Sequence, residues 1–256
     1  MRLVRTAAEA RALARGDVGL VPTMGALHEG HLSLFAAARA ESETVVASIF
    51  VNPAQFEDPG DLARYPRDED RDIALAAEAG VDVLFVPPPE EIYPPGFATW
   101  VDVERQGAEG AARPGHFRGV ATVCLKLFAI VRPARAYFGQ KDGQQVALVG
   151  RLVRDLELGL AIRVLPTVRD ADGLALSSRN VRLSPEERGR ALGLPRALES
   201  ARGAADPVAA ARAAMNGLDP DYVEIVELDS ARLLAAAVRV GSTRLIDNVL
   251  LEGDLG

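Results

Sequence analysis

The stretch Val18-Gly19-Leu20-Val21-Pro22-Thr23-Met24-Gly25-Ala26-Leu27-His28-Glu29-Gly30-His31 decides how the rest of the chain is interpreted. Its first four residues form an apolar run typical of a β-strand, and the apolar positions of 32–40 predict a helix. A strand that turns through glycines into a helix directs backbone N–H groups and the positive helix end to one point, which suits a phosphate. The i, i+3 spacing places His28 and His31, two of the three histidines in the chain, on one side of that helix start. We therefore take this pair as the candidate active centre.

The composition indicates a globular enzyme. The chain has 256 residues, of which 48% are hydrophobic and 25% charged, enough for one large domain or two modest ones. The net charge of −7 argues against a nucleic-acid-binding protein, whose surface should be basic. No apolar run approaches the length of a membrane span, and the amino terminus lacks the apolar segment of a signal peptide. The single cysteine, Cys124, fits a reducing compartment, so we expect a soluble cytoplasmic protein with no membrane and no nucleic-acid partner.

Apolar runs and helical patterns alternate over the first two thirds of the chain. Continuous β-branched runs without polar alternation are typical of parallel strands covered on both faces. Strands are predicted at 18–21, 44–51, 81–86, 134–138 and 162–168, with an outlying strand at 99–103, and helices at 6–13, 32–40, 67–79, 120–131 and 144–156. This alternation predicts an α/β fold with a Rossmann-like doubly wound parallel sheet over residues 1–168.

A change of texture near Asp170 predicts a second, smaller domain. Residues 169–256 contain a tight turn at Asp172-Gly173, a serine-rich loop at 174–180 and a capping box that begins at Ser184. A helix is expected to open at Asp206-Pro207, and strands are expected at 221–228 and 243–250. We expect a small C-terminal α+β domain with a hinge at 167–171.

Several polar side chains follow the predicted strand ends. In doubly wound sheets, ligands bind outside the carboxyl ends of the strands. His28, His31, Asn52, Gln55 and the turn 139–142 all come directly after such ends. The sequence therefore predicts one site built from these segments.

Three other interpretations of polar motifs are weaker. The spacing of Gly25 and Gly30 is that of a P-loop, but His31-Leu32 follows where a P-loop needs Lys and Ser or Thr. His-x-x-His has metal-ligand spacing, but no cysteine or third histidine is near it in sequence. The acidic run Asp68, Glu69, Asp70 and Asp72 is interpreted as a solvated helix face. No protein metal site is predicted.

Two of these motifs resemble the signatures of a known superfamily. His28-Glu29-Gly30-His31 resembles the HIGH signature of HIGH-type nucleotidyltransferases, and Leu176-Ser177-Ser178-Arg179 resembles their mobile phosphate-binding motif. The fuller pattern resembles the pantoate–β-alanine ligase (pantothenate synthetase) family through blocks that occur in family order. These blocks are PTMGALHEGH (22–31), FVNPAQF (50–56), YPR (65–67), RPGHFRG (113–119), YFGQKD (137–142), QQ (144–145) and DGLALSSRN (172–180).

The resemblance implies an AMP-forming ligase of the coenzyme A pathway. The pantoate carboxylate would attack the α-phosphorus of ATP, and the amine of β-alanine would then displace AMP to give pantothenate. ATP is then a substrate, Mg²⁺ arrives with it, and the protein is a homodimer. Two alternatives remain at this point: another HIGH-type nucleotidyltransferase, or a nucleotide-binding regulatory module without catalysis.

The resemblance also assigns roles to residues. It implies that His31 is the catalytic proton donor, with His28 and Lys141 also catalytic, and that neutral amides hold pantoate and β-alanine. The amides are those of Asn52, Gln55 and Gln145. The ATP-binding residues are Met24, Gly25, Ala26, Leu27, His28, Glu29, Gly30, His31, Gly139, Gln140, Lys141, Asp142, Val168, Leu176, Ser177, Ser178 and Arg179. A carboxylate is already ionised at neutral pH, so the first step needs alignment and charge stabilisation rather than a general base.

Some residues keep a simpler interpretation beside the functional one. Asn52-Pro53 can be a strand-ending turn, Gln144 and Gln145 a solvated helix face, and Lys141-Asp142 a helix start capped by Asp142. His116 and Arg118 either cover the site or order a loop. The chain departs from the family pattern at Gln140, usually Glu, at Gly143, usually larger, and in a shortened segment, 104–112.

Overall fold

The chain folds around two sheets, the larger of which is parallel. The structure is a computed structural model that describes residues 1–104, 107–228 and 230–254. The larger sheet has six strands in the order β1-β4-β3-β2-β5-β6, and every pair is parallel. Its strands are β1 (Arg2–Val4), β2 (Val18–Thr23), β3 (Thr44–Ile49), β4 (Val83–Phe85), β5 (Arg135–Gly139) and β6 (Ala161–Leu165). The predicted doubly wound α/β sheet is confirmed, and β1 is a strand that the sequence interpretation missed.

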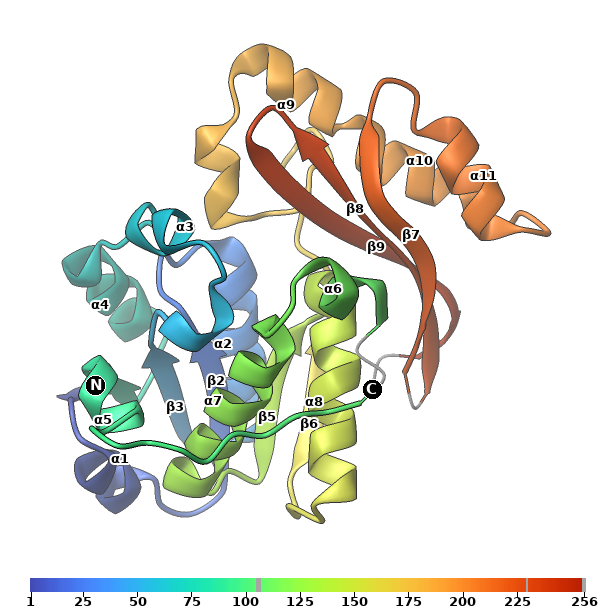
Figure 1. Cartoon of the computed structure of the whole chain (residues 1–256). Helices are drawn as coiled ribbons and strands as arrows, with labels where there is room; N and C mark the ends of the chain where they lie inside the picture. Colours follow the sequence, from blue (N-terminus) through green and yellow to red (C-terminus); the bar gives the residue numbers. More distant parts are fainter. Residues whose placement is uncertain (105–106, 229, 255–256) are drawn as a thin grey trace.

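Helices cover both faces of this sheet because successive strand residues point to opposite sides. Leu20 packs into one core and the adjacent Val21 into the other, and both side chains are fully buried. The first core is closed by α1 (Ala7–Leu13), α7 (His116–Val131) and α8 (Gly143–Asp155). The second core is closed by α2 (Glu29–Glu41) and α4 (Glu69–Glu78). The carboxyl ends of the strands point toward the second sheet (Figure 1).

Helix starts follow their sequence signals. Thr6 begins α1 with a capping box to Glu9, and Ser184 begins α9 (Pro185–Ala191) with a capping box to Glu187. Asp206 caps α11 (Pro207–Ala214). Each side-chain cap satisfies an N–H that the helix cannot pair internally. These three predictions are confirmed.

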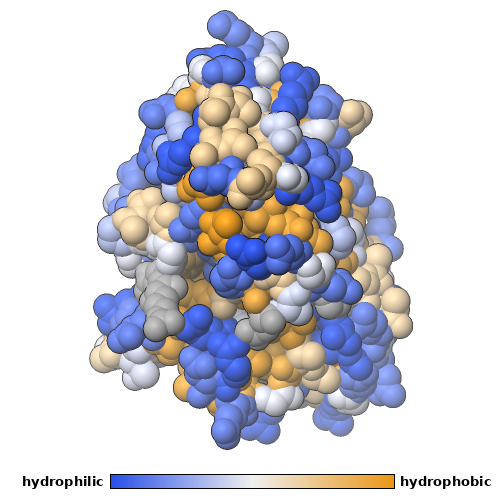
Figure 2. Space-filling model, turned by 90° about the vertical axis from the view of Figure 1, so that its right-hand side faces the viewer, coloured by the Kyte–Doolittle hydropathy of each residue, from blue (hydrophilic) through white to orange (hydrophobic). Residues whose placement is uncertain are grey.

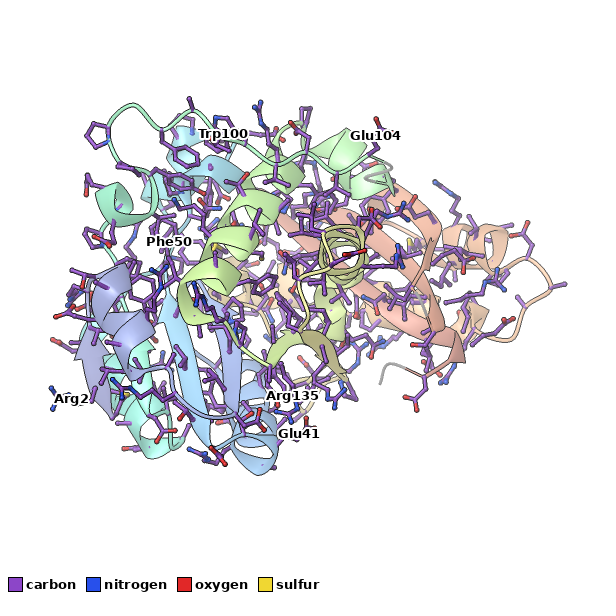
Figure 3. All side chains as sticks on the ribbon, turned by 90° about the horizontal axis from the view of Figure 1, so that it is seen from below. Arg2, Glu41, Phe50, Trp100, Glu104 and Arg135 are labelled. Carbon is purple, nitrogen blue, oxygen red and sulfur yellow. The ribbon has the colours of Figure 1, made fainter. Side chains whose placement is uncertain are left out.

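The strand predicted at 99–103 is wrong. These residues run as an extended segment over α7, where the Val101 N–H donates to the Thr122 hydroxyl at 3.0 Å instead of to a neighbouring strand. The segment is held by aromatic contacts, and Trp100 stacks on Tyr93 with ring centroids 5.7 Å apart. Seen from below, Trp100 and Glu104 lie along this segment, away from Glu41 and Arg135 at the amino ends of the strands (Figure 3).

Other connections contain short helices that the sequence interpretation left as loops. They are η1 (Pro53–Gln55), α3 (Pro59–Ala63), α5 (Pro89–Ile92), α6 (Gly107–Ala112) and η2 (Gln140–Asp142). Helix α7 begins at His116 and not at Val120, because Gly115 takes the left-handed conformation (φ 81°) and turns the chain directly into the helix. The shortening expected at 104–112 falls partly on residues 105–106, which lie outside the described residues.

The second sheet is antiparallel and has the order β7-β8-β9. Its strands are β7 (Asp219–Glu227), β8 (Ala231–Val240) and β9 (Thr243–Gly253). The sequence interpretation missed β8, whose centre is Ala235-Ala236-Ala237, because alanine has little strand preference and burial between two neighbours fixes this strand. Leading to this sheet are η3 (Ser178–Arg182), α9, α10 (Gly193–Ala201) and α11. The boundary between residues 168 and 169 stays a prediction.

The two faces of the second sheet have different surroundings. One face packs against α10 and α11 through residues such as Leu234 and Leu198. The other face contacts α6 and α8 and keeps partly exposed members, among them Ile246 and Leu250. Figure 2 shows the molecule from the right-hand side of Figure 1, where hydrophobic residues gather near mid-height between hydrophilic ones. Within the described part of the chain, no helix has the length and apolar character needed to cross a membrane.

Candidate active site

A cleft of about 240 Å³ opens at the carboxyl ends of β2 and β5. Residues from several separated segments line it: the histidine turn, the loop after β3, one side of α7, the end of β5 with the start of α8, and the segment that leads to η3. A second cleft of about 320 Å³ continues from it toward β8 and β9. Lys141, Ser177 and Arg179 line both clefts. The predicted convergence of strand-end residues is therefore found in space.

The two histidines of the turn cap their own helix. His28 is the N-cap of α2, and its Nδ1 accepts from the Gly30 N–H at 3.2 Å. His31 reaches back, and its Nδ1 accepts from the His28 N–H at 3.3 Å. A neutral imidazole that accepts at Nδ1 carries its proton on Nε2. The capping contacts therefore leave both Nε2–H groups as donors in the cleft, with ring centroids 4.1 Å apart.

Burial keeps both rings neutral. It lowers the pKa of His28 to about 4, with a further contribution from the Lys141 charge. Burial also lowers the pKa of His31 to about 3, assisted by His28 and Lys141. At neutral pH the pair therefore offers two uncharged N–H donors rather than two cations.

The backbone of the same turn is held from behind by Asp72. This carboxylate on α4 is 1% exposed and accepts from the Ala26 N–H at 2.7 Å and the Leu27 N–H at 2.8 Å. Gly25 and Ala26 both have positive φ, 77° and 50°, and this turn aims the two N–H groups at Asp72. The interpretation of the acidic run as a solvated helix face is wrong for Asp72, because this residue lies on the buried side of α4. Since these N–H groups are occupied, side chains must supply much of any phosphate contact here.

An amide chain fixes Gln55 on the opposite wall. Asn52 is 1% exposed, and its Nδ2 donates to Gln55 Oε1 at 3.0 Å and to the Gly119 carbonyl at 3.1 Å. The Tyr93 hydroxyl donates to Asn52 Oδ1 at 2.8 Å. Burial raises the pKa of Tyr93, which keeps this donor protonated. Asn52 also caps η1, so it both ends the strand with a turn and lines the cleft.

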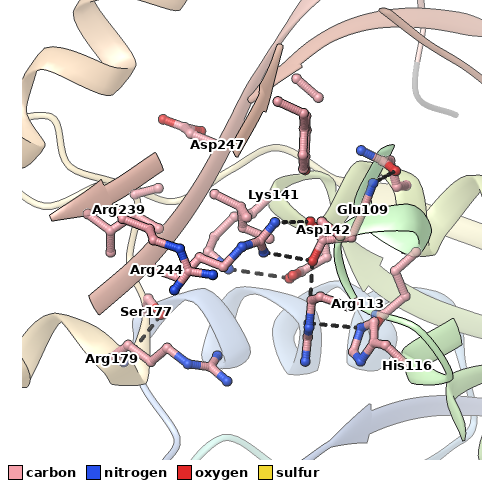
Figure 4. A pocket seen from close by; sticks show the side chains of 18 of the residues that line it. Glu109, Arg113, His116, Lys141, Asp142, Ser177, Arg179, Arg239, Arg244 and Asp247 are labelled. Atoms are coloured by element: carbon pink, nitrogen blue, oxygen red, sulfur yellow. Dashed lines mark hydrogen bonds and ion pairs between the residues drawn. The ribbon is translucent and has the colours of Figure 1, made fainter. Parts of the chain in front are cut away.

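The backbone of Gln55 is fixed as well. His116 Nδ1 donates to the Gln55 carbonyl at 2.9 Å, and Arg113 donates to His116 Nε2 at 3.1 Å. Burial and the Arg113 charge lower the pKa of His116 to about 4. Arg113 pairs in turn with Glu109, which also binds Arg244 of β9 (Figure 4). His116 thus orders the loop that carries Gln55 while it lines both clefts.

Gly119 allows this loop to approach α7. A Cβ built at residue 119 would lie against the Ala54 carbonyl group and 2.8 Å from the Gln55 backbone nitrogen. Any side chain there would displace main chain rather than a movable side chain. Arg118, by contrast, pairs with Asp102 at 3.4 Å and covers Trp100, so it orders the extended segment and not the site.

The polar residues after β5 separate into cleft-facing and buried groups. Lys141 lines the cleft with its Nζ 3.5 Å from the Asp142 carboxylate, and Asp142 makes no side-chain cap to α8. Gln145 lines the cleft, whereas Gln144 is 8% exposed and accepts from the Glu109 N–H at 2.8 Å. The solvated-face alternative is therefore wrong for Gln144.

The segment Ser177–Arg179, here called the serine–arginine segment, contacts the first domain across the cleft. Ser177 caps η3 by accepting from the Arg179 N–H at 3.3 Å. The Arg179 guanidinium pairs with Asp61 of α3 at 3.2 Å, and Arg182 pairs with the same carboxylate at 3.0 Å. Although burial opposes it, these two arginines lower the pKa of Asp61. Ser177 and Arg179 of this segment line the same two clefts as Lys141.

Most of the predicted site residues line this cleft, and of the others all but Glu29 make contacts with other parts of the fold. The cleft is lined by Met24, His28, Gly30, His31, Asn52, Gln55, Gly139, Lys141, Asp142, Gln145, Val168, Leu176, Ser177, Ser178 and Arg179. Gly25, Ala26 and Leu27 turn toward Asp72, Glu29 is exposed, and Gln140 bonds to Asn248 of β9. No group of three or more potential metal ligands occurs among the described residues.

Comparisons with known proteins agree with the geometry. A family model described as pantoate-beta-alanine ligase matches residues 1–250. The chain is 53% identical to a pantothenate synthetase of Roseiflexus castenholzii over 277 residues, covering 98% of this chain and 100% of the relative. The structure is similar to pantothenate synthetase from Thermus thermophilus, with a TM-score of 0.92, 50% identity and coverage of 98% and 99%. It is also similar to a Francisella tularensis pantoate-beta-alanine ligase complexed with beta-gamma ATP and beta-alanine, with a TM-score of 0.85, 36% identity and full coverage of both chains (100%).

Proposed function

The chain belongs to the pantoate–β-alanine ligase family, and from that premise we propose how its residues divide the reaction between them. The enzyme condenses pantoate with β-alanine in two steps. The pantoate carboxylate displaces pyrophosphate from the α-phosphorus of ATP to form pantoyl adenylate. The β-alanine amine then displaces AMP from the acyl carbon, which forms the amide bond of pantothenate.

The observation that carries the role assignment is the pair of neutral histidines with fixed Nε2–H groups. In the first step, negative charge gathers on the oxygens around the α-phosphorus, and fixed donors that need no reorientation stabilise it. Because the pKa of His31 lies near 3, its ring is neutral at pH 7 and is a far weaker acid than an imidazolium. We therefore propose that His31, with His28 beside it, acts as a hydrogen-bond donor and keeps its proton.

Lys141 and the segment Ser177–Arg179 are proposed to bind the departing phosphates. Lys141 supplies a point charge, and Arg179 supplies a planar set of donors that matches phosphate oxygens. Arg179 would exchange its contact with Asp61 for the phosphates when ATP enters. The position of this segment at the mouth of both clefts supports the assignment.

Gln55 and Gln145 are proposed to hold pantoate, and Asn52, whose side-chain polar atoms are all engaged within the protein, is proposed to position Gln55. A neutral amide orients the carboxylate without the strong ion pair that would hold back a nucleophile. The fixed orientation of Gln55, set by Asn52 on its side chain and His116 on its carbonyl, supports this role. Such positioning lets the carboxylate face the α-phosphorus without a general base.

Magnesium, assembly and location complete the proposal. Mg²⁺ would arrive bound to ATP and neutralise phosphate charge, and Asp142 is the carboxylate among the described residues lining the 240 Å³ cleft that would hold it.

We propose a homodimer, as in the family that the sequence resembles, which light scattering of the purified protein would test. We also propose a cytoplasmic location, which suits the buried Cys124 thiol.

Pantoate-dependent exchange of pyrophosphate into ATP tests the first step. Exchange should require pantoate, and neither β-alanine nor an amino acid should replace it. A single turnover with pantoate and ATP alone should leave an adenylate that releases AMP when β-alanine is added. Exchange that needs no pantoate would contradict the proposal.

A further inference from the structure

Two consecutive polar residues are buried in the last strand. Asp247 and Asn248 of β9 are 2% and 1% exposed, and they pair with Ala236 and Ala235 of β8. Burying a carboxylate and an amide costs free energy unless their polar atoms are hydrogen-bonded. Since neighbouring strand residues point to opposite faces, the two side chains reach different partners.

Asn248 holds the turn that carries Lys141. Its Nδ2 donates to the Gln140 carbonyl at 2.7 Å and to the Lys141 carbonyl at 3.0 Å. Its Oδ1 accepts from Gln140 Nε2 at 2.9 Å. The amide thus uses both of its donors and its oxygen on η2, from a strand 107 residues farther along the chain. The backbone of Lys141 cannot shift without breaking these bonds.

Asp247 holds the short hairpin of residues 168–176, which leads to the serine–arginine segment. Its carboxylate accepts two bonds from Arg169, at 2.7 and 3.1 Å, in a fork geometry. Arg169 also donates to the Gly173 carbonyl at 3.2 Å, which fixes the turn of the hairpin. The hairpin closes through the Leu176 N–H, which donates to the Val168 carbonyl at 3.0 Å, and Ser177 follows directly.

One further bond joins the two residues. The Asn248 backbone N–H donates to Asp247 Oδ1 at 2.8 Å, so the Asp247 carboxylate also holds the main chain at Asn248. Lys141 in one anchored segment, and Ser177 and Arg179 in the other, are among the residues that line both clefts. Two adjacent residues of one strand therefore contribute to the spacing between these two segments, beside the contact of Arg179 with Asp61.

We propose that Asp247 and Asn248 are positioning residues for the departing phosphates of ATP. They touch no substrate; they fix the spacing between Lys141 and Ser177–Arg179. This inference rests on the function proposed above for those two segments. A displacement of about 1 Å at such groups costs on the order of 100-fold in rate, so the adenylation step depends on this pair. The second step, in which pyrophosphate has already left, does not.

Separate measurement of the two half-reactions tests the inference. In Asn248→Ala and Asp247→Asn enzymes, pantoate-dependent exchange of pyrophosphate into ATP should fall at least about tenfold. Aminolysis of chemically prepared pantoyl adenylate by β-alanine should stay within about twofold of the unmodified enzyme, since that substrate carries no β- or γ-phosphate. The matched control is Asn216→Ala, which removes an exposed asparagine after α11 and should change neither rate.

Each result decides the question. An equal fall in both half-reactions, or unchanged exchange, overturns the inference, because a general loss of structure would not separate the two steps. If Asn248→Ala does not fold, as judged by thermal unfolding, the milder Asp247→Asn carries the test alone. Lys141→Ala separates failure of the proposed function from failure of the positioning role. Unchanged exchange in Lys141→Ala overturns the proposed role of Lys141. Lost exchange in Lys141→Ala together with normal exchange in Asn248→Ala overturns only the positioning role.

Discussion

Two walls of the cleft are supported in different ways: the histidine wall, formed by His28 and His31, and the phosphate wall, formed by Lys141 and Ser177–Arg179. His28 and His31 are fixed by bonds within their own turn and by Asp72, all within elements of the parallel sheet and its helices. Lys141 is fixed by Asn248 of β9, which belongs to the other sheet. Ser177–Arg179 follow the hairpin that Asp247 of β9 holds through Arg169, and Arg179 also pairs with Asp61 of α3. The groups proposed to meet the reacting phosphorus are thus held locally, while the groups proposed to bind the departing phosphates depend on contacts from elements of both sheets.

Removing a histidine breaks the local wall directly. His31→Ala takes away one fixed donor to the developing phosphate charge, and we expect pantoate-dependent exchange to fall about 100- to 1,000-fold. Exchange within about threefold of the unmodified rate would exclude His31 from the chemistry.

Asp72→Asn tests whether the local wall depends on its anchor. An amide can accept one of the two N–H groups of Ala26 and Leu27 but turns a donor toward the other. We expect exchange to fall about 10- to 100-fold and the free energy of unfolding to fall by about 1–3 kcal/mol. Asp70→Asn, on the exposed face of the same helix, is the matched control and should behave as the unmodified enzyme. Equal behaviour of the two variants would contradict the anchoring role.

The neutral histidines also give the protein a defined pH dependence. In the unfolded chain a histidine titrates near pH 6.5, whereas the pKa of folded His31 is about 3 and that of His28 about 4. The unfolded state therefore binds more protons between these values, so stability is present above pH 6.5 and declines as the pH falls toward 4. Urea unfolding at pH 7 and pH 5 should differ by about 2 kcal/mol less in His31→Gln than in the unmodified protein. An identical pH dependence in the two proteins would show that His31 is not held neutral.

The smallest expected effect sharpens the comparison on the pantoate side. Tyr93→Phe removes one bond to Asn52 Oδ1, which still accepts from the Ala54 N–H at 3.2 Å. Loss of a hydrogen bond worth about 1 kcal/mol should raise the KM for pantoate about fivefold. The KM for ATP should stay the same, and a matching rise there would mean that Tyr93 supports the whole cleft rather than Gln55.

The comparison also explains what could be predicted from the sequence. The turn around His28 and His31, and Asn52 after β3, follow from local patterns because strand ends and helix caps depend on neighbouring residues. Asp72 was misinterpreted because its partners lie 46 and 45 residues away, and an acidic run looks solvated without them.

The second sheet is harder to predict from the sequence for the same reason, because its residues depend on contacts with other segments of the chain. Strand β8 carries alanines whose conformation is decided by its neighbours, and the role of Asn248 depends on a turn far away in the chain. The extended segment at 99–103 has strand-like residues but pairs with no strand among the residues that the structure describes. Long-range pairing is the part that local preferences do not encode.

The close approach at Gly119 has a consequence for how this enzyme can change over generations. The atoms that exclude a side chain there belong to the peptide linkage between Ala54 and Gln55, which every amino-acid sequence shares. Because no mutation at another position removes backbone atoms, a substitution of Gly119 cannot be compensated by a second mutation that makes space. A library randomised at position 119 and selected for growth without added pantothenate should return glycine alone.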